Sequence, residues 1–316
     1  MNQLNNIKKF TNVVMDTGNL ELIKKYLPKD VTTNPSLVYK EMTSYIYQEF
    51  IADAVSYANK QGGDKKTRLQ NANDKLYVNV SKEILKLISG RVSIEIDIRL
   101  SFDYLALIER AKKIIFLCNQ YGIEKNRVLI KLAATWEGIK AAEILEKSGI
   151  NCNLTLIFSL IQARACAEAQ VHLISPFIGR VCDWYFKNKK MQHKSLLYLD
   201  PGIKLAYKIY NFYKQRNYNT IIMGASFRNL KQIYALIGYD AITVAPIFFE
   251  QLSCMQKSNT ILPHILPSLN KFKKLSESKF RWQYNYNAMA IEKLSEGIRL
   301  FFNDQKKIDN IFLKYL

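Results

Sequence analysis

A lysine inside an apolar run is the first residue of this sequence that could do covalent chemistry. Lys131 lies in the run 128–133 (VLIKLA), which is typical of a buried strand. In a strand it shares a face with Leu129 and Ala133, and burial on that face disfavours the charged ammonium. A neutral amine can attack a carbonyl carbon and form a Schiff base. The alternative interpretation is a lysine whose amine reaches solvent from the strand end, and this run alone leaves both open.

Two carboxylates could move the protons that Schiff-base chemistry requires. Asp16 ends one strand-like run, and Glu95 alternates with apolar residues in another, 92–96. Two acids in different environments can divide the general acid and general base steps. Each also has a structural interpretation. Asp16 could cap the helix that follows it, and Glu95 could form an ion pair with Arg91 or Arg99.

Two arginines that follow late strand-like runs could bind a phosphate. Arg180 comes five residues after Ser175, and Arg228 comes four residues after Gly224. A guanidinium can hold a phosphate through two parallel N–H bonds, and barrel enzymes often bind phosphate with their late loops. Either arginine taken alone is more typical of a surface ion pair. Gly18 and Gly224 lie outside any GxGxxG or Walker pattern, so the sequence does not support a nucleotide site.

The histidines and cysteines do not have the spacing of a metal site. His172, His193 and His264 are isolated from one another in the sequence. The five cysteines are odd in number, scattered and without a CxxC pair: Cys118, Cys152, Cys166, Cys182 and Cys254. We therefore expect no metal and no disulfide framework, and a reducing cytoplasm is the default location.

Eight short strand-like runs alternate with helical patterns along the 316 residues. The strands are expected at 12–15, 30–33, 92–96, 127–132, 151–158, 171–175, 220–224 and 241–245. Helices are expected at 45–59, 82–88, 102–121, 136–147, 204–216 and 229–237, with Ser101 capping the third and Gly122 ending it. Strands that alternate with helices indicate a parallel sheet, and eight such units favour a closed (β/α)₈ (TIM) barrel.

We expect residues 1–316 to form one barrel domain with additional terminal helices. The tail 288–316 has the pattern of an amphipathic helix, which could close the barrel or contact a second subunit. The stretches 61–67 and 255–270 read as loops within that domain. The polar N-terminal residues 1–9 lack the apolar core of a signal peptide, and no apolar stretch is long enough to cross a bilayer.

Polar residues alternate with apolar residues inside two of the expected strands. Ser93 and Glu95 occupy one parity of the third strand, and Asn153 and Thr155 occupy one parity of the fifth. Helices follow these strands and cover the apolar face, so the polar parity points into the barrel. Polar groups buried there without a function would be costly to desolvate. The alternation therefore predicts a site at the C-terminal ends of the strands.

The net charge of +19 invites a nucleic-acid interpretation, which we do not favour. Forty-six Lys and Arg stand against 27 Asp and Glu, and most of the basic residues are lysines spread along the chain. Binding to a phosphate backbone requires positive charge clustered on one face. We expect a basic solvated surface and neither a nucleic-acid nor a membrane partner.

Nine blocks of this sequence, in order over nearly the whole chain, resemble bacterial transaldolases. They are 16–19 (DTGN), 32–37 (TTNPSL), 91–97 (RVSIEID), 130–133 (IKLA), 149–156 (GINCNLTL), 162–167 (QARACA), 174–180 (ISPFIGR), 223–229 (MGASFRN) and 280–285 (FRWQYN). The resemblance implies a cofactor-independent class I enzyme of the non-oxidative pentose phosphate pathway, usually a homodimer. Such an enzyme moves a dihydroxyacetone unit from sedoheptulose 7-phosphate to glyceraldehyde 3-phosphate, giving erythrose 4-phosphate and fructose 6-phosphate.

The resemblance also implies a role for each matching residue. Lys131 would form the Schiff base, and Asp16 would take the proton of the donor hydroxyl during carbon–carbon cleavage. Glu95 would shuttle protons through a water held with Thr155. The remaining implied substrate residues are Asn34, Ser93, Asn153, Ser175 and Phe177 for the dihydroxyacetone unit, and Arg180, Ser226 and Arg228 for the phosphate.

A related lyase that releases free dihydroxyacetone is the nearest alternative function. Those relatives resemble a shorter chain with Gln and Tyr where this sequence has Glu95 and Phe177, which favours the transferase. A nucleic-acid-binding protein that has lost catalysis is the alternative from another class. The departures from the family pattern are Gln170 in place of a glycine, Ala134 and Ile94, and none removes a catalytic group.

Overall fold

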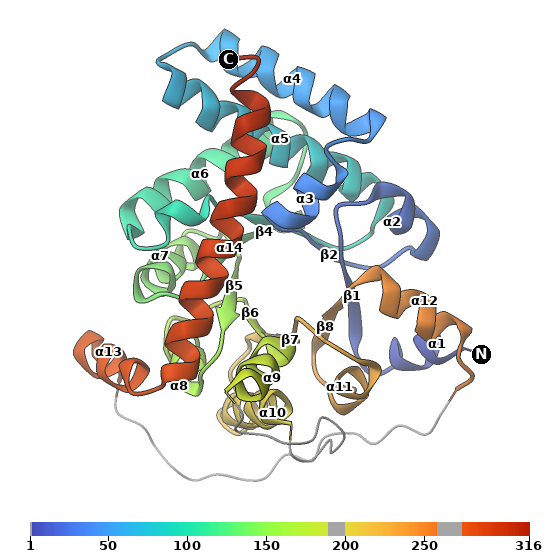
Figure 1. Cartoon of the computed structure of the whole chain (residues 1–316). Helices are drawn as coiled ribbons and strands as arrows, with labels where there is room; N and C mark the ends of the chain where they lie inside the picture. Colours follow the sequence, from blue (N-terminus) through green and yellow to red (C-terminus); the bar gives the residue numbers. More distant parts are fainter. Residues whose placement is uncertain (1, 189–199, 258–273) are drawn as a thin grey trace.

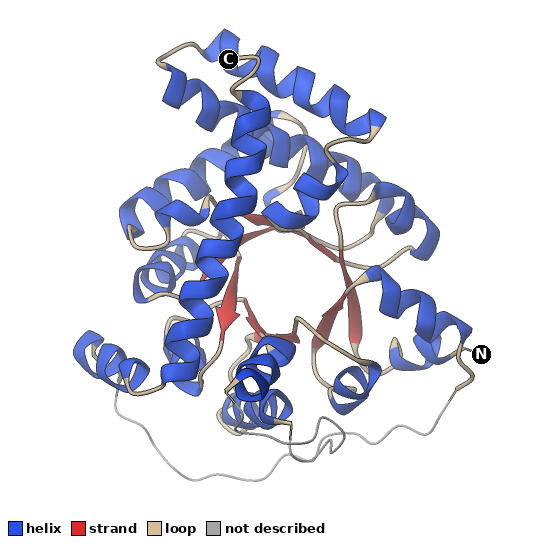
Figure 2. Cartoon of the chain, in the orientation of Figure 1, coloured by secondary structure: helices blue, strands red, loops and turns tan. Residues whose placement is uncertain are grey.

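Eight parallel strands close into a barrel in the order β1 to β8 (Figures 1 and 2). The computed structural model describes residues 2–188, 200–257 and 274–316. Each strand pairs with its neighbours in sequence, and β8 pairs with β1 to complete the ring. The strands are β1 Asn12–Asp16, β2 Val31–Thr32, β3 Val92–Glu95, β4 Val128–Ala133, β5 Cys152–Ile157, β6 Leu173–Pro176, β7 Ile221–Gly224 and β8 Ala241–Val244.

Helices surround this barrel and cover the outer face of its strands (Figure 2). In chain order they are α1 Gln3–Ile7, α2 Leu20–Tyr26, α3 Pro35–Glu41, α4 Tyr45–Gln61, α5 Lys65–Leu87, η1 Ile98–Leu100, α6 Tyr104–Gln120, η2 Lys125–Arg127, α7 Trp136–Lys147, α8 Leu160–Glu168, α9 Ile178–Lys187, α10 Pro201–Lys214, α11 Leu230–Ala235, α12 Pro246–Cys254, α13 Glu277–Asn285 and α14 Ala288–Phe312. The predicted (β/α)₈ barrel with terminal helices is confirmed.

Three of the predicted local features are wrong. The helix expected at 82–88 is only the end of the 23-residue α5, so the loop expected at 61–67 shrinks to 62–64. Polar side chains are buried along α5, and they interrupt the apolar periodicity on which the prediction relied. Asp103, not Ser101, caps α6 and accepts a hydrogen bond from the backbone N–H of Ala106. Most of the loop expected at 255–270, from 258 onward, lies outside the described residues.

The side-chain parity predicted for the strands is confirmed inside the barrel. Ile130 and Leu132 of β4 pack in the main core beneath the helices, whereas Leu129 joins a separate apolar layer at the floor of the barrel. Above that floor, Lys131 is in register with Glu95 of β3 and with Asn153 of β5. A polar layer therefore crosses the barrel at the level of Lys131.

Three residues other than glycine adopt left-handed backbone conformations in or near the functional blocks: Leu156, Gln170 and Ser226. Leu156 has φ of 56° at the register shift in β5, immediately after Thr155. Gln170 has φ of 55° just after α8, where the resemblance indicated a glycine. The strain of a non-glycine residue in this region typically costs about 1 kcal/mol, and at Gln170 it affects stability and not chemistry.

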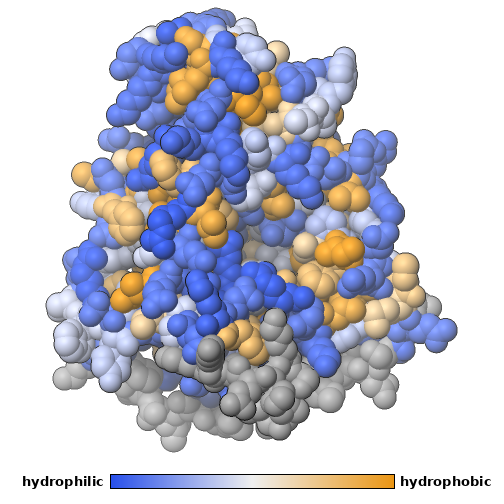
Figure 3. Space-filling model, in the orientation of Figure 1, coloured by the Kyte–Doolittle hydropathy of each residue, from blue (hydrophilic) through white to orange (hydrophobic). Residues whose placement is uncertain are grey.

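Helix α14 runs past the open end of the barrel on the β5 side, and its C-terminal half packs against α5 (Figure 1). It contacts α3, α5, α9, β5 and η1 along its length. The predicted amphipathic tail helix is thus confirmed, and it covers the C-terminal ends of the strands. On the face that it crosses, hydrophilic side chains predominate and apolar groups form separate patches (Figure 3).

Candidate active site

Lys131 projects from the middle of β4 into the barrel, so the solvent-exposed interpretation of this lysine is wrong. Only 6% of its side chain is exposed. The Nζ atom lies 2.9 Å from Oε2 of Glu95 and donates a hydrogen bond of 3.0 Å to the carbonyl oxygen of Thr33. The amine is therefore held by one carboxylate and one backbone carbonyl at the polar layer of the barrel.

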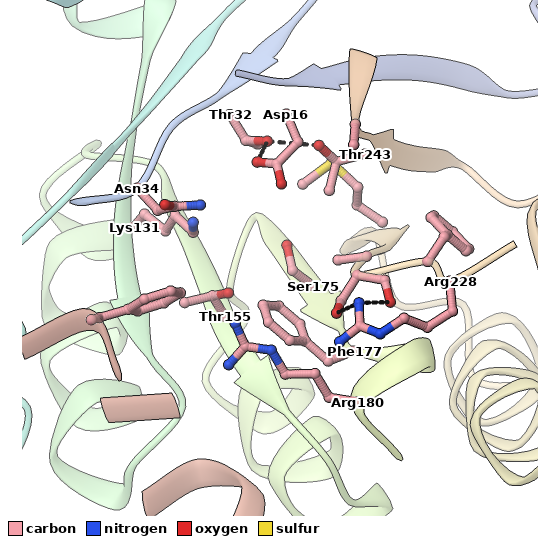
Figure 4. Close-up of a pocket in the computed structure, with 16 residues that line it drawn as sticks. Asp16, Thr32, Asn34, Lys131, Thr155, Ser175, Phe177, Arg180, Arg228 and Thr243 are labelled. Carbon is pink, nitrogen blue, oxygen red and sulfur yellow. Dashed lines mark hydrogen bonds between the residues drawn. The ribbon is translucent and has the colours of Figure 1, made fainter. Parts of the chain in front are cut away.

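Asp16 ends β1 and faces the same interior (Figure 4). Its Oδ1 accepts a hydrogen bond of 2.8 Å from the Thr32 hydroxyl, which lies 2.6 Å from the Thr243 hydroxyl. Burial raises the pKa of Asp16, and the nearby Lys131, Thr32 and Arg180 oppose that rise. The N-cap interpretation is wrong, because Asn19 caps α2.

Glu95 is buried beside the lysine and does not pair with the arginines that the sequence offered. Arg99 binds Asp97 and Asp309 instead. Burial raises the pKa of Glu95, and the charge of Lys131 is the main opposing influence. Within the part of the chain that the structure describes, neither Oε1 of Glu95 nor Oγ1 of Thr155 has a hydrogen-bond partner.

A chain of hydrogen bonds links three of the predicted substrate residues. Ser175 donates to Oδ1 of Asn153 at 2.8 Å, and Nδ2 of Asn153 donates to Ser93 at 3.1 Å. Ser175 lines the cavity above Lys131, whereas Ser93 and Asn153 are buried without lining it. Asn34 lines the cavity too, and its side chain caps α3 by accepting from the backbone N–H of Leu37.

The two arginines predicted to bind phosphate differ in their surroundings. Arg228 is exposed, and its guanidinium donates to Asp183 at 2.8 and 3.0 Å and to the Ser226 hydroxyl at 3.3 Å. The ion-pair interpretation thus describes this arginine in the present structure. Arg180 is largely buried, and its Nη1 has no partner among the described residues. Burial and the neighbouring Arg228 lower the pKa of Arg180.

These side chains surround a cavity of about 220 Å³ at the C-terminal ends of the strands (Figure 4). It is lined by Asp16, Thr32, Asn34, Lys131, Thr155, Ser175, Phe177, Arg180, Met223, Ala225, Ser226, Phe227, Arg228, Thr243, Ala245 and Phe301. The sequence prediction did not include seven of these residues: Thr32, Met223, Ala225, Phe227, Thr243, Ala245 and Phe301. Thr32 stood in a block used for the resemblance, but nothing in the sequence pointed to Thr243 or to Phe301 of α14.

The cavity is lined by a buried amine, the Asp16 carboxylate and two guanidinium groups, and the Glu95 carboxylate is buried beside the amine without lining the cavity. A barrel that holds a lysine between two such carboxylates has the groups that a Schiff-base-forming aldol enzyme requires: a nucleophile and two acids able to exchange protons. Among residues 2–188, 200–257 and 274–316, no group of three His, Cys, Asp or Glu side chains could hold a metal ion. His193 and His264 lie outside those ranges.

Comparison with known proteins narrows this class to one family. Residues 13–311 match the family described as Transaldolase/Fructose-6-phosphate aldolase. The chain is 62% identical to a transaldolase of Wigglesworthia glossinidia brevipalpis, over 99% of this chain and 98% of that protein. It is 51% identical to transaldolase A of Escherichia coli K12, over 98% of each chain. It is also 51% identical to a transaldolase of Baumannia cicadellinicola, over the full length of both. The chain belongs to the transaldolase/fructose-6-phosphate aldolase family.

Removal of the Asp16 charge should stabilise the protein more at high pH than at low pH. Because the folded state raises the pKa of Asp16, the folded state retains this proton more strongly than the unfolded chain. That stabilisation is present at low pH and is lost as the pH rises through the folded pKa. Asp16→Asn, which cannot ionise, should therefore melt a few degrees above the wild type at pH 8, with a smaller difference at pH 5.

Thermal unfolding followed by circular dichroism measures both differences. Glu109→Gln, on the exposed side of α6, is the matched control. We expect its melting temperature to differ from that of the wild type by the same amount at pH 5 and at pH 8. An Asp16→Asn difference that does not grow with pH would contradict the buried, destabilised carboxylate.

Proposed function

We propose that this cavity transfers a dihydroxyacetone unit between sugar phosphates through a Schiff base on Lys131. The activity of the chain is that of a transaldolase, a transferase, because its full-length relatives at 51–62% identity are transaldolases. The observation that carries the residue assignment is the Lys131 amine, which lies inside the closed barrel 2.9 Å from Glu95. The proposed donor is sedoheptulose 7-phosphate and the acceptor is glyceraldehyde 3-phosphate.

In the first proposed step, Lys131 passes its proton to Glu95, 2.9 Å away, and the resulting neutral amine attacks the ketone carbon of the donor. A tetrahedral carbinolamine forms and then loses its hydroxyl as water. A group next to the nitrogen must remove a proton from it as the carbinolamine forms and then donate a proton to the hydroxyl that leaves as water. Glu95 is close enough to do so through a water shared with Thr155, because buried oxygens of both residues have no partner in the described chain. The raised pKa of Glu95 suits it to both directions of proton transfer.

In the second proposed step, Asp16 takes the proton from the donor hydroxyl next to the bond that breaks. The electron pair of the carbon–carbon bond moves toward the protonated imine, which leaves an enamine on Lys131 and releases erythrose 4-phosphate. The raised pKa of Asp16 makes it a stronger base than an ordinary aspartate, and Thr32 orients its carboxylate. The enamine then attacks the acceptor aldehyde, and the reverse steps give fructose 6-phosphate.

The remaining residues of the cavity would hold the substrate during these steps. Asn34 and Ser175 line the cavity and can bind dihydroxyacetone hydroxyls directly. Ser93 and Asn153 support Ser175 from below through the hydrogen-bond chain. We therefore propose that these two buried residues act mainly by fixing the Ser175 hydroxyl.

The phosphate would bind between Arg180 and the 226–228 loop. Arg180 lines the cavity and its buried Nη1 has no partner among the described residues, whereas Arg228 must first exchange Asp183 for the phosphate. Ser226 contributes its hydroxyl from a left-handed backbone conformation with φ of 63°. Two guanidinium groups of equal charge near one another are stabilised once a dianion lies between them.

We also propose that residues 1–316 act as one catalytic domain in the cytoplasm, as a homodimer. Within the described helices, none is both long and apolar enough to span a bilayer.

Large apolar side chains stay exposed on α13 and after it, with Trp282 71% and Tyr286 88% exposed. A second copy would cover them. Sedimentation equilibrium should give twice the chain mass of 36.7 kDa, and a single-chain mass at micromolar concentration would contradict the dimer.

Replacement of the proposed nucleophile should abolish turnover. Lys131→Met keeps the side-chain length but removes the amine that forms the covalent bond. Borohydride reduction of the wild type with fructose 6-phosphate should trap the bound unit on the peptide that contains residue 131, as measured by mass spectrometry. A label on another lysine, or transfer by a folded Lys131→Met protein, would refute the assignment.

Wild-type cleavage that stays equally fast without the aldehyde acceptor would indicate a lyase.

Loss of Arg228 should selectively weaken the binding of phosphorylated substrates. Each charge-assisted hydrogen bond is worth about 1.5–3 kcal/mol, so Arg228→Ala should raise the KM of fructose 6-phosphate roughly 10-fold or more. Asp183→Asn is the matched control: it removes the same ion pair but leaves the guanidinium, so we expect an unchanged or lower KM. Equal losses for fructose and fructose 6-phosphate in Arg228→Ala would contradict a phosphate contact.

A further inference from the structure

Helix α14 presents a buried stripe of side chains to the open end of the barrel. Gly297, Phe301, Gln305 and Asp309 follow one another at four-residue spacing, which places them on one face of the helix. All four are buried, and Phe301 is only 3% exposed. The adjacent Phe302 is exposed on another face. The stripe is therefore the surface through which α14 contacts the cavity region.

The C-terminal half of this stripe is fixed by a buried polar network. Gln305 accepts a hydrogen bond of 3.0 Å from the Tyr77 hydroxyl, and its Nε2 donates to Asn73 at 2.8 Å. Asp309 forms an ion pair of 3.0 Å with Arg99. Because buried polar groups are costly to leave without partners, this network resists any shift of the helix along its axis.

The N-terminal half of the stripe is fixed by close packing. A Cβ atom at Gly297 would lie 2.8 Å from Cδ2 of Leu156 and 3.3 Å from Nη1 of Arg180. The absent side chain thus lets α14 approach the end of β5 and the guanidinium together. Phe301 lies one helical turn from each anchor, so the position of its ring is determined from both sides.

The ring of Phe301 lies against the buried arginine of the cavity. Its centroid is 5.5 Å from Cζ of Arg180, and the Phe177 centroid is 5.2 Å from the same atom. Both distances are within the range of a cation–π interaction. In the described chain no carboxylate forms an ion pair with Arg180, and its Nη1 donates no hydrogen bond. The two rings are therefore the principal contacts that hold this guanidinium.

We infer that Phe301 is a positioning residue that holds the Arg180 guanidinium ready for the substrate phosphate. An aromatic ring interacts with the flat face of a guanidinium and leaves the N–H groups at its edge available. A carboxylate partner would occupy those groups, as Asp183 does at Arg228. The inference deepens the proposed function and rests on the phosphate role assigned to Arg180 there.

Substitution of the ring should change phosphate recognition more than chemistry. Phe301→Leu keeps an apolar side chain but removes the cation–π contact, and we expect the KM for fructose 6-phosphate to rise about 5- to 30-fold. The kcat/KM for unphosphorylated fructose should fall by a clearly smaller factor, which reflects the contact of the same ring with the Lys131 amine 5.9 Å away. Phe301→Tyr, which keeps the ring, should restore the KM. Phe302→Leu makes the same substitution one position along on the exposed side and should behave as the wild type.

A second variant tests the same inference without removing the ring. The gain in helix propensity of Gly297→Ala offsets part of the cost of displacing Leu156, and circular dichroism should show a folded protein. The added methyl group points toward Nη1 of Arg180, and we expect a raised KM for fructose 6-phosphate with unphosphorylated fructose again less affected.

The outcomes separate this inference from the proposed function. A wild-type protein that transfers no dihydroxyacetone unit would refute the proposed function itself. An active wild type whose Phe301→Leu variant loses both donors equally, or matches Phe302→Leu, would refute the positioning role of Phe301 alone. A selective rise in KM that Phe301→Tyr reverses would establish it.

Discussion

The ion pair between Lys131 and Glu95, buried inside a closed barrel, is the constraint on which the rest of the structure depends. Removing two charges from water costs several kcal/mol per ion, and the attraction between them repays this only when their geometry is fixed. Neighbouring strands in register provide that geometry, because β3 and β4 place the two residues side by side. Asp16 and Arg180 extend the pair into a balanced group of two cations and two carboxylates.

The surrounding structure keeps this group buried and oriented. The apolar floor formed by Leu129 and its neighbours closes the barrel below the polar layer. Helix α14 crosses above it, anchored through Gln305 and Gly297 on either side of Phe301. In such a site hydrogen bonds and charges act more strongly than they do in water, which is the property that proton transfer at an imine requires.

Much of the fold could be predicted because its signals are local. Each strand was recognisable from a short apolar run, and the inward parity of Glu95 and Thr155 followed from alternation alone. The predictions failed where contacts between distant residues override the local pattern. The buried polar residues of α5, such as Asn73, hid the length of that helix, because their partners come from α14 more than 200 positions away. Ser101 and Asp103 were both suitable caps, and only the backbone path selected Asp103.

By itself, the sequence determined which chemical groups the site contains and which way they face, since strand parity is set by neighbouring residues. The tertiary structure alone decided which groups touch. The Thr32 hydroxyl meets the Thr243 hydroxyl across the barrel interior, from strands that flank β1, and Asp183 binds Arg228 from another element. Phe301 reaches Arg180 only because α14 returns across the barrel mouth. Contacts between residues so distant in the chain depend on the closure of the barrel and the packing of α14, and no local pattern encodes them.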